Sequence, residues 1–136
     1  MTINIPFFQY ALKGKCKSGS VMTSPFTCGL DAALFVMGGK WKPLIVYHLM
    51  QGTLRYAQLR RAVGKVSDKV LAQQLKELIA DGVVARHDFG EIPPRVEYSL
   101  TPFGKSLAQA LGHLCEWGEH HTDVLAAIVE RRARAG

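Results

Sequence analysis

Cys28 is the residue of this sequence whose type and position best suit covalent chemistry. It stands in the segment SPFTCGLDAAL, directly before residues with a helical pattern. The positive end of a helix dipole stabilises a thiolate, and the thiolate is the reactive form of cysteine. Cys28 is therefore a candidate to react with electrophiles or oxidants. The alternative is a small nonpolar side chain that packs between Phe26 and Leu30.

The other two cysteines are less constrained by their surroundings. Cys115 lies beside the apolar stripe of Leu111 and Leu114, which favours packing in a core or an interface. Its alternative role is to resolve a disulfide with a cysteine of a second subunit. Cys16 belongs to an N-terminal tail. Because an odd number of cysteines without metal spacing is not typical of a secreted disulfide framework, we expect reduced thiols.

Residues of metal-binding types are grouped near the C-terminus. His113, Glu116 and His120 are spaced by three and four residues and share one helix face, with His121 beside them. A tetrahedral site needs further ligands, and no clear second cluster supplies them. We expect a polar helix face or an interface here, and no bound metal.

No pattern of catalytic residues is present. No Gly-rich phosphate loop follows a strand, and no set of Ser, His and acid has a recognisable spacing. Gly38, Gly39 and Lys40 lack the upstream glycine and the following Ser or Thr of a P-loop. The sequence therefore predicts a protein that is not an enzyme and needs no cofactor.

The positive charge of the chain is concentrated in one block. The 136 residues contain 17 Lys and Arg against 11 Asp and Glu, a net charge of +6, and between residues 40 and 69 only Asp68 opposes seven basic side chains. Such a field attracts nucleic acid first and an anionic membrane surface second, and the alternative is a solvated face. No transmembrane segment or signal sequence is recognisable, so we expect a cytoplasmic protein that does not bind membranes.

These residues must be positioned by a regular series of elements. The sequence predicts helices over 30–37, 41–50 and 56–63, a brief extended piece at 53–56, and a helix that begins after Ser67 and ends at Gly82. Two strands, 83–88 and 95–100, follow with a Pro-containing connection. Thr101 and Pro102 begin a long helix that runs past Ile128. We expect a flexible tail over 1–24, one domain over 25–130 and a frayed end over 131–136.

The helix after Ser67 is the best specified of these elements. Ser67 is a good N-cap, and Leu71, Leu75 and Leu78 recur on one face. The outward positions carry hydrogen-bond donors and one small residue: Lys69, Ala72, Gln73 and Lys76.

The order of elements predicts an α+β, mainly α, winged helix-turn-helix with a two-stranded β wing and a long C-terminal dimerisation helix. An α-helix fits the major groove of DNA, and a ribbon beside it can place an arginine on the backbone. We expect Gln73 to suit an adenine edge and most basic residues to contact phosphates. The predicted DNA-binding residues are Lys40, Arg55, Arg60, Arg61, Lys65, Ser67, Lys69, Ala72, Gln73, Lys76 and Arg95.

Several motifs in combination resemble the HxlR-type winged-helix regulators of bacteria, relatives of the MarR-like group. They are a cysteine before the first helix, GGKW, the Leu-x3-Leu core of the recognition helix, DGVVAR and PPRVEYSLTPFG, within residues 28–117. The resemblance implies a homodimer that binds operator DNA. It also implies that Cys28 matches a cysteine through which several members sense electrophiles or oxidants, that residues 67–76 form the recognition helix, and that Arg95 is the basic wing residue.

The last helix carries more apolar surface than one small domain needs. We expect this surplus to form a dimer interface, because two recognition helices about 34 Å apart can read a palindrome; the alternative is that it folds back on the first helix. The predicted interface residues are Leu30, Leu34, Leu114, Trp117, Val124, Leu125 and Ile128.

The sequence thus predicts a homodimeric, sequence-specific transcriptional repressor that senses electrophiles or oxidants through Cys28. Its expected partners are double-stranded operator DNA, a second copy of the chain, and an electrophile, oxidant or small-molecule effector. Two alternatives stay open. In one, Cys28 is structural and the regulator responds to a small molecule or to nothing. In the other, the winged helix binds protein or RNA.

Overall fold

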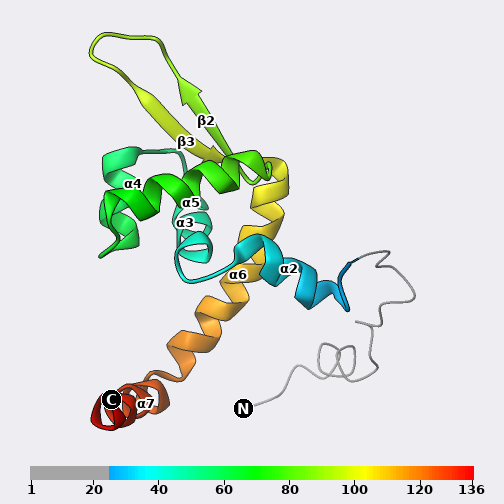
Figure 1. Ribbon diagram of the computed structural model, residues 1–136, viewed down its shortest axis with the longest axis vertical. Coiled ribbons are helices and arrows are strands. Elements are labelled where there is room, and N and C mark those ends of the chain that lie inside the picture. Colours follow the sequence, from blue (N-terminus) through cyan, green and yellow to red (C-terminus); the bar gives the residue numbers. More distant parts are fainter. Residues whose placement is uncertain (1–24) are drawn as a thin grey trace. The chain divides into compact units, whose positions relative to one another are not determined.

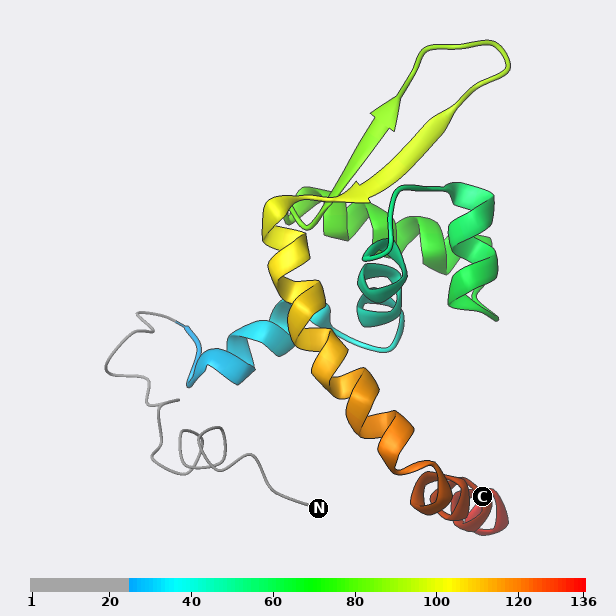
Figure 2. The same cartoon turned by 180° about the vertical axis from the view of Figure 1, so that it is seen from behind.

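A computed structural model describes residues 25–136 of the protein (Figures 1 and 2). The tail predicted for residues 1–24, including Cys16, lies outside the described residues. The chain divides after Gly38 into two units, and the described part of the first contains helix α2 (Gly29–Met37). Within residues 25–136, no helix has the length and hydrophobicity needed to cross a bilayer.

The second unit, residues 39–136, follows the predicted order of helices and strands. Each predicted helix and strand is present within a few residues of its expected bounds, apart from a division of the last helix. The elements are α3 (Trp41–Leu49), β1 (Leu54–Arg55), α4 (Tyr56–Val63), α5 (Asp68–Ala80), β2 (Val84–Asp88), β3 (Val96–Leu100), α6 (Pro102–His120) and α7 (Thr122–Ala135).

Helix α5 begins and ends as its local sequence predicts. The Ser67 hydroxyl oxygen accepts a hydrogen bond from the backbone N–H of Val70 at 3.1 Å, which satisfies one of the free donors at the helix start. After the helix, Gly82 has a φ of +76°, a conformation that glycine adopts without steric cost.

The core of the second unit forms around α3. This helix contacts α4, α5, α6 and β3, and Figures 1 and 2 both show α5 crossing it. Burial of these side chains supplies most of the stabilisation of such a small domain. The most deeply buried side chains are Ile45, Val46, Leu59, Leu71, Leu78, Val83 and Val84.

The two-stranded wing is present as predicted, and a third short strand joins it in one sheet. Strands β2 and β3 pair antiparallel, with Val84 opposite Leu100 and Asp88 opposite Val96. The short β1 pairs with the other edge of β3, so the order in the sheet is β1-β3-β2. The brief extended piece predicted at 53–56 is β1, and its pairing with β3, which joins residues far apart in the sequence, was not predicted.

The start of α6 is bonded to the turn before the wing. The Thr101 side chain accepts from the backbone N–H of Gly104 at 3.0 Å and donates to the carbonyl oxygen of Gly82 at 2.5 Å. The backbone of Gly104 lies so close to the carbonyl group of Val83 that a Cβ atom there would collide with it. These contacts fix α6 against the end of the sheet.

The sequence predicted one continuous C-terminal helix. This prediction was wrong, because the helix breaks at His121. The His121 backbone N–H bonds to the carbonyl oxygen of Gly118, one residue short of the helical partner. In an unbroken helix this N–H would bond to the carbonyl oxygen of Trp117. That oxygen instead lies 2.8 Å from His121 Nδ1, and the rings of Trp117 and His121 stack. Helix α7 then continues to Ala135, so residues 131–135, where a frayed end was predicted, are helical.

Candidate nucleic-acid interface

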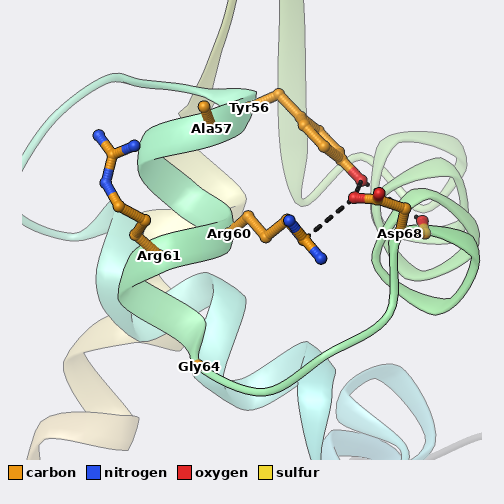
Figure 3. A pocket seen from close by; sticks show the side chains of 6 residues that line it. All are labelled: Tyr56, Ala57, Arg60, Arg61, Gly64 and Asp68. Carbon is orange, nitrogen blue, oxygen red and sulfur yellow. Dashed lines mark hydrogen bonds and ion pairs between the residues drawn. The ribbon is translucent and has the colours of Figure 1, made fainter.

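Helices α4 and α5 form a helix-turn-helix whose turn is surrounded by positive charge. The turn contains Gly64, with a φ of +110°, and a hollow of about 520 Å³ opens between the end of α4 and the start of α5 (Figure 3). Arg60 and Arg61 line this hollow from α4. In Figure 3 Arg60 points toward α5, whereas Arg61 points away from it on the other side of α4.

An acidic residue at the start of α5 is held by two groups of α4. Arg60 Nε lies 3.0 Å from Asp68 Oδ1, and the Tyr56 hydroxyl donates to the same oxygen at 3.1 Å. Burial, and then the hydrogen bond to Asp68, raises the pKa of the Tyr56 phenol above its ordinary value. The phenol therefore remains a donor at neutral pH, and it links the two helices of the motif.

A second acidic residue of α5 is neutralised from the interior. Lys42 of α3 is buried, and its Nζ lies 2.6 Å from Glu77 Oε1. The Gln73 amide nitrogen donates to Glu77 Oε2 at 2.8 Å. These two contacts, the Gln73 hydrogen bond first, lower the pKa of Glu77. Neither acid of the helix therefore stands as an isolated negative charge beside its exposed donors.

The structure places the predicted DNA-binding residues mostly on the surface. They come from the start of α3, the helix-turn-helix and the wing, and all but Arg95 are exposed. The exposed ones are Lys40, Arg55, Arg60, Arg61, Lys65, Ser67, Lys69, Ala72, Gln73 and Lys76.

Arg95 is held within the wing. Its guanidinium lies over the ring of Phe89, 3.8 Å from the ring centre, and contacts Glu97 at 3.2 Å and Glu91 at 3.6 Å. The contact of Arg95 with a phosphate remains a prediction.

A shallow hollow between α5 and the sheet brings together residues that the sequence did not group. Its volume is about 250 Å³, and Lys76 of α5 and Arg86 of β2 line it together with Tyr56 and Tyr98. Arg86 is exposed, and its nearest carboxylate, Asp88, is 3.9 Å away. Sequence reasoning placed Arg86 in the ribbon and gave it no role. The signal that could have found it is a basic residue at an outward strand position next to the recognition helix.

Sequence reasoning also missed that Lys42 is buried, because it grouped this lysine with the basic residues between 40 and 69. Lys42 stands three and four residues before Ile45 and Val46, both fully buried, so it occupies the inner face of α3. That spacing was the signal for a buried, paired cation.

Cys28 lies at the N-cap of α2, as predicted. Its carbonyl oxygen accepts the first helical hydrogen bond, from Ala32 N–H at 3.1 Å, and its side chain is half-buried. Asp31 in the first turn accepts from the backbone N–H and the hydroxyl of Thr27, at 3.0 and 3.3 Å. A carboxylate and a thiol thus share the positive end of this helix.

Cys115 is half-buried in the second unit. Its thiol donates to the hydroxyl oxygen of Tyr47 at 3.2 Å, and Glu119 lies 3.6 Å from the sulfur. These contacts are those of a packed thiol between α3 and α6.

The histidine cluster at the end of α6 bonds to its own helix. His120 Nδ1 lies 2.8 Å from the carbonyl oxygen of Glu116, and His113 Nδ1 is 3.9 Å from the Glu116 carboxylate. In the part of the chain that the structure describes, no three His, Cys, Asp or Glu side chains are grouped to hold a metal.

The predicted interface residues are incompletely covered. Leu30 and Leu34 of α2 and Leu114, Trp117 and Val124 of α6 and α7 are exposed. Leu125 and Ile128 are half-buried, and no residue of α7 is buried.

The comparisons with known proteins agree with this geometry. The model of the HxlR-like helix-turn-helix family matches residues 36–125. An uncharacterised HTH-type transcriptional regulator of Bacillus subtilis, YkvN, is 43% identical over 98 residues, which are 72% of this chain and 83% of YkvN.

Two similar solved structures are redox regulator HypR in its reduced form and diamide-treated YodB from B. subtilis. HypR has a TM-score of 0.67 and 42% identity, with 72% of this chain and 97% of HypR covered. YodB has a TM-score of 0.58 and 30% identity, with 73% and 95% covered.

Proposed function

The chain belongs to the HxlR-like helix-turn-helix family and is a DNA-binding transcriptional regulator, and from this premise we propose that it is a homodimeric repressor whose operator affinity is set by Cys28. The exposed face of α5 is the observation that carries the proposal for operator recognition. It presents two lysines, a glutamine and an alanine, while the acids of that helix are paired with Arg60 and Lys42.

Base recognition is assigned to the N-terminal two turns of α5. Ser67, Lys69 and Gln73 lie where an inserted helix meets base edges, and Ala72 leaves room for close approach. The basic residues around them, together with Arg95, are assigned to phosphates. They would supply the part of the affinity that falls as salt rises.

Dimerisation is supported by the exposed apolar side chains of α6 and α7. Leu114, Trp117 and Val124 are exposed, and tryptophan is a common anchor of protein interfaces. A second copy of the same surface is the simplest cover for them, since most soluble oligomers are symmetric dimers. Leu30 and Leu34 of α2 are proposed to extend the interface.

Redox sensing is supported by the position of Cys28 at the start of α2 and by the similarity to the redox regulator HypR. With a quinone, the thiolate sulfur bonds to a ring carbon, and the ring becomes a hydroquinone after uptake of a proton. With diamide, the Cys28 thiols of two protomers form a disulfide bond, and diamide takes up the two electrons and two protons that they lose and becomes the hydrazine. Either product changes the packing at the proposed interface, and a shift of a few Å between recognition helices loses one half-site.

Selection of bound duplexes from a random pool, with reduced and diamide-treated protein in parallel, tests the whole proposal. The reduced protein is expected to enrich a palindrome, and the treated protein to lose most of that enrichment. Equal binding of random and selected duplexes at moderate salt would contradict sequence-specific regulation.

Two cysteine variants separate the sensor from a structural thiol. Cys28→Ser is expected to keep operator affinity and to lose the response to diamide or a quinone, whereas Cys115→Ser keeps both. An unchanged response of Cys28→Ser would make Cys28 structural.

A further inference from the structure

We propose that Lys42 and Glu77 are positioning residues for base recognition, because together they fix which way the side-chain amide of Gln73 faces. The inference rests on the proposed function, in which Gln73 reads a base. It adds a specificity device that extends from the interior of α3 to the exposed face of α5.

The device begins with a charge in an unusual place. Lys42 is only 9% exposed and sits on the face of α3 that carries Ile45 and Val46. Lysine is rarely buried unless it is paired, and an apolar side chain of similar size often serves stability equally well. The retention of a cation here is better explained by what it does to its partner, Glu77, at 2.6 Å.

Glu77 transfers this constraint to Gln73 one turn earlier on the same helix. Its Oε1 faces Lys42, which leaves Oε2 to accept from the Gln73 Nε2 at 2.8 Å. The same two contacts hold the pKa of Glu77 below its ordinary value, so the side chain is a carboxylate at neutral pH. A carboxylate only accepts hydrogen bonds, and it therefore requires a donor from its neighbour.

This requirement selects one of the two orientations of the Gln73 amide. The NH2 group must face Glu77, so the carbonyl oxygen faces away from it. One N–H remains beside the carbonyl oxygen. An acceptor next to a donor matches the adenine edge, where the N6 amino group donates and N7 accepts. The flipped amide would place these groups in the reverse order, which no longer fits the same base.

Glu77→Gln is the most direct test, since a glutamine at 77 keeps the shape but can both donate and accept. Gln73 is then free to flip. Asp81→Asn is the matched control, because Asp81 is exposed at the C-cap of the same helix and its change removes the same charge. Lys42→Met removes the other end of the device, with Lys105→Met, at an exposed lysine of α6 outside the proposed DNA-binding set, as its control.

The readout is base preference, measured by duplex selection with the full-length wild type and each variant. Wild type is expected to prefer one base pair per half-site by roughly five- to a hundredfold, and Gln73→Ala identifies that position by erasing the preference. Glu77→Gln and Lys42→Met should lower the preference there to about threefold or less, with the other positions unchanged. The thermal midpoint of each variant shows that the fold is retained, and Asp81→Asn and Lys105→Met should keep the preference.

The outcomes distinguish this inference from the proposed function. A wild type that selects no sequence refutes sequence-specific regulation, and the inference with it. A wild type that selects a palindrome whose preferences survive Glu77→Gln refutes the inference alone. A palindrome in which no position responds to Gln73→Ala does the same.

Discussion

The 39–136 unit has a winged-helix end, which contains α5, and a C-terminal end, which contains α7. The first buries its apolar side chains and the second leaves them at least partly exposed. In α5, Leu71, Leu75 and Leu78 are buried, and the surface carries polar groups held by ion pairs. In α7 no residue is buried, and Val124 and Val129 are exposed. Figures 1 and 2 show α7 at the end of α6 that is remote from the wing. The winged helix thus completes its core within one chain, whereas the C-terminal helices leave apolar side chains uncovered, which is the surface proposed for the dimer.

The largest expected effect comes from a charge placed on the C-terminal surface. Trp117→Glu should dissociate the proposed dimer and lower operator affinity by at least about a hundredfold, because a carboxylate would replace a tryptophan that the proposed interface buries, and one half-site would be lost. Sedimentation and fluorescence anisotropy with labelled operator measure both effects. Phe103→Glu is the matched control, since Phe103 and Trp117 are equally exposed, at 56%, on the same helix. A dimer that survives Trp117→Glu would remove α6 from the interface.

Substitutions of apolar residues at the two ends should differ in how their effects depend on protein concentration. Leu71→Ala, at a fully buried site, is expected to lower the free energy of unfolding by about 2–5 kcal/mol at every concentration. Ile128→Ala on α7 should lower it mainly by weakening the proposed dimer, so its effect should follow the concentration of protomer. Thermal unfolding across a hundredfold dilution series tests this difference. A concentration-independent effect of Ile128→Ala would mean that α7 is stabilised within one chain.

Helix α6 joins the two ends. Of its glycines, Gly104 is packed against the sheet and Gly112 is not, so substitutions at these two positions should have opposite effects on stability. Gly104→Ala would push a methyl group into the carbonyl of Val83, so we expect a loss of about 1–3 kcal/mol in the free energy of unfolding. Gly112 has open space where a Cβ atom would lie, and Gly112→Ala should stabilise the helix by about 0.5–1 kcal/mol. Chemical denaturation measures both. If Gly104→Ala were neutral, α6 would not be tightly fixed to the sheet.

The features that the sequence predicted well depend on neighbours along the chain. Helix α5 followed from a serine cap and leucines at helical spacing, and these are local signals. The pairing of β1 with β3 and the contact of Lys42 with Glu77 join residues more than thirty positions apart, which no local pattern encodes. The break at His121 depends on whether the backbone N–H or the ring Nδ1 of His121 contacts the carbonyl oxygen of Trp117, and the residue types do not decide this.

The candidate interface shows the same division. Its exposed basic residues were found from residue type and helical spacing, because an outward position is a local property of a helix. Their partners were not found. Asp68 as the partner of Arg60 depends on how α4 and α5 pack, and Glu91 and Glu97, which are close to Arg95 in the sequence, depend on the conformation of the wing. Sequence reasoning therefore identified which groups the surface carries but not which of them are already engaged.

The smallest expected effect concerns the pH dependence of the ion pair beneath α5. The pKa of Glu77 is lowered from 4.5 in the folded protein, so the unfolded chain binds more protons between the folded and unfolded pKa values. The stability from this carboxylate is present in full above the unfolded pKa and is lost as the pH falls through the folded pKa. Wild type should therefore unfold at a slightly higher temperature than Glu77→Gln at pH 7, and this advantage should shrink below about pH 4.5.

Calorimetric scans from pH 3 to 7 measure the difference, and Glu130→Gln on α7 controls for the change in net charge. Because Glu77 is partly exposed, with 41% of its side chain accessible, solvent screening keeps the effect small. If the two curves stayed parallel through acid pH, the contact with Lys42 would add nothing to stability. The buried lysine would then be explained by the orientation of Gln73 alone, and the polar surface of α5 would be organised for recognition at no gain to the fold.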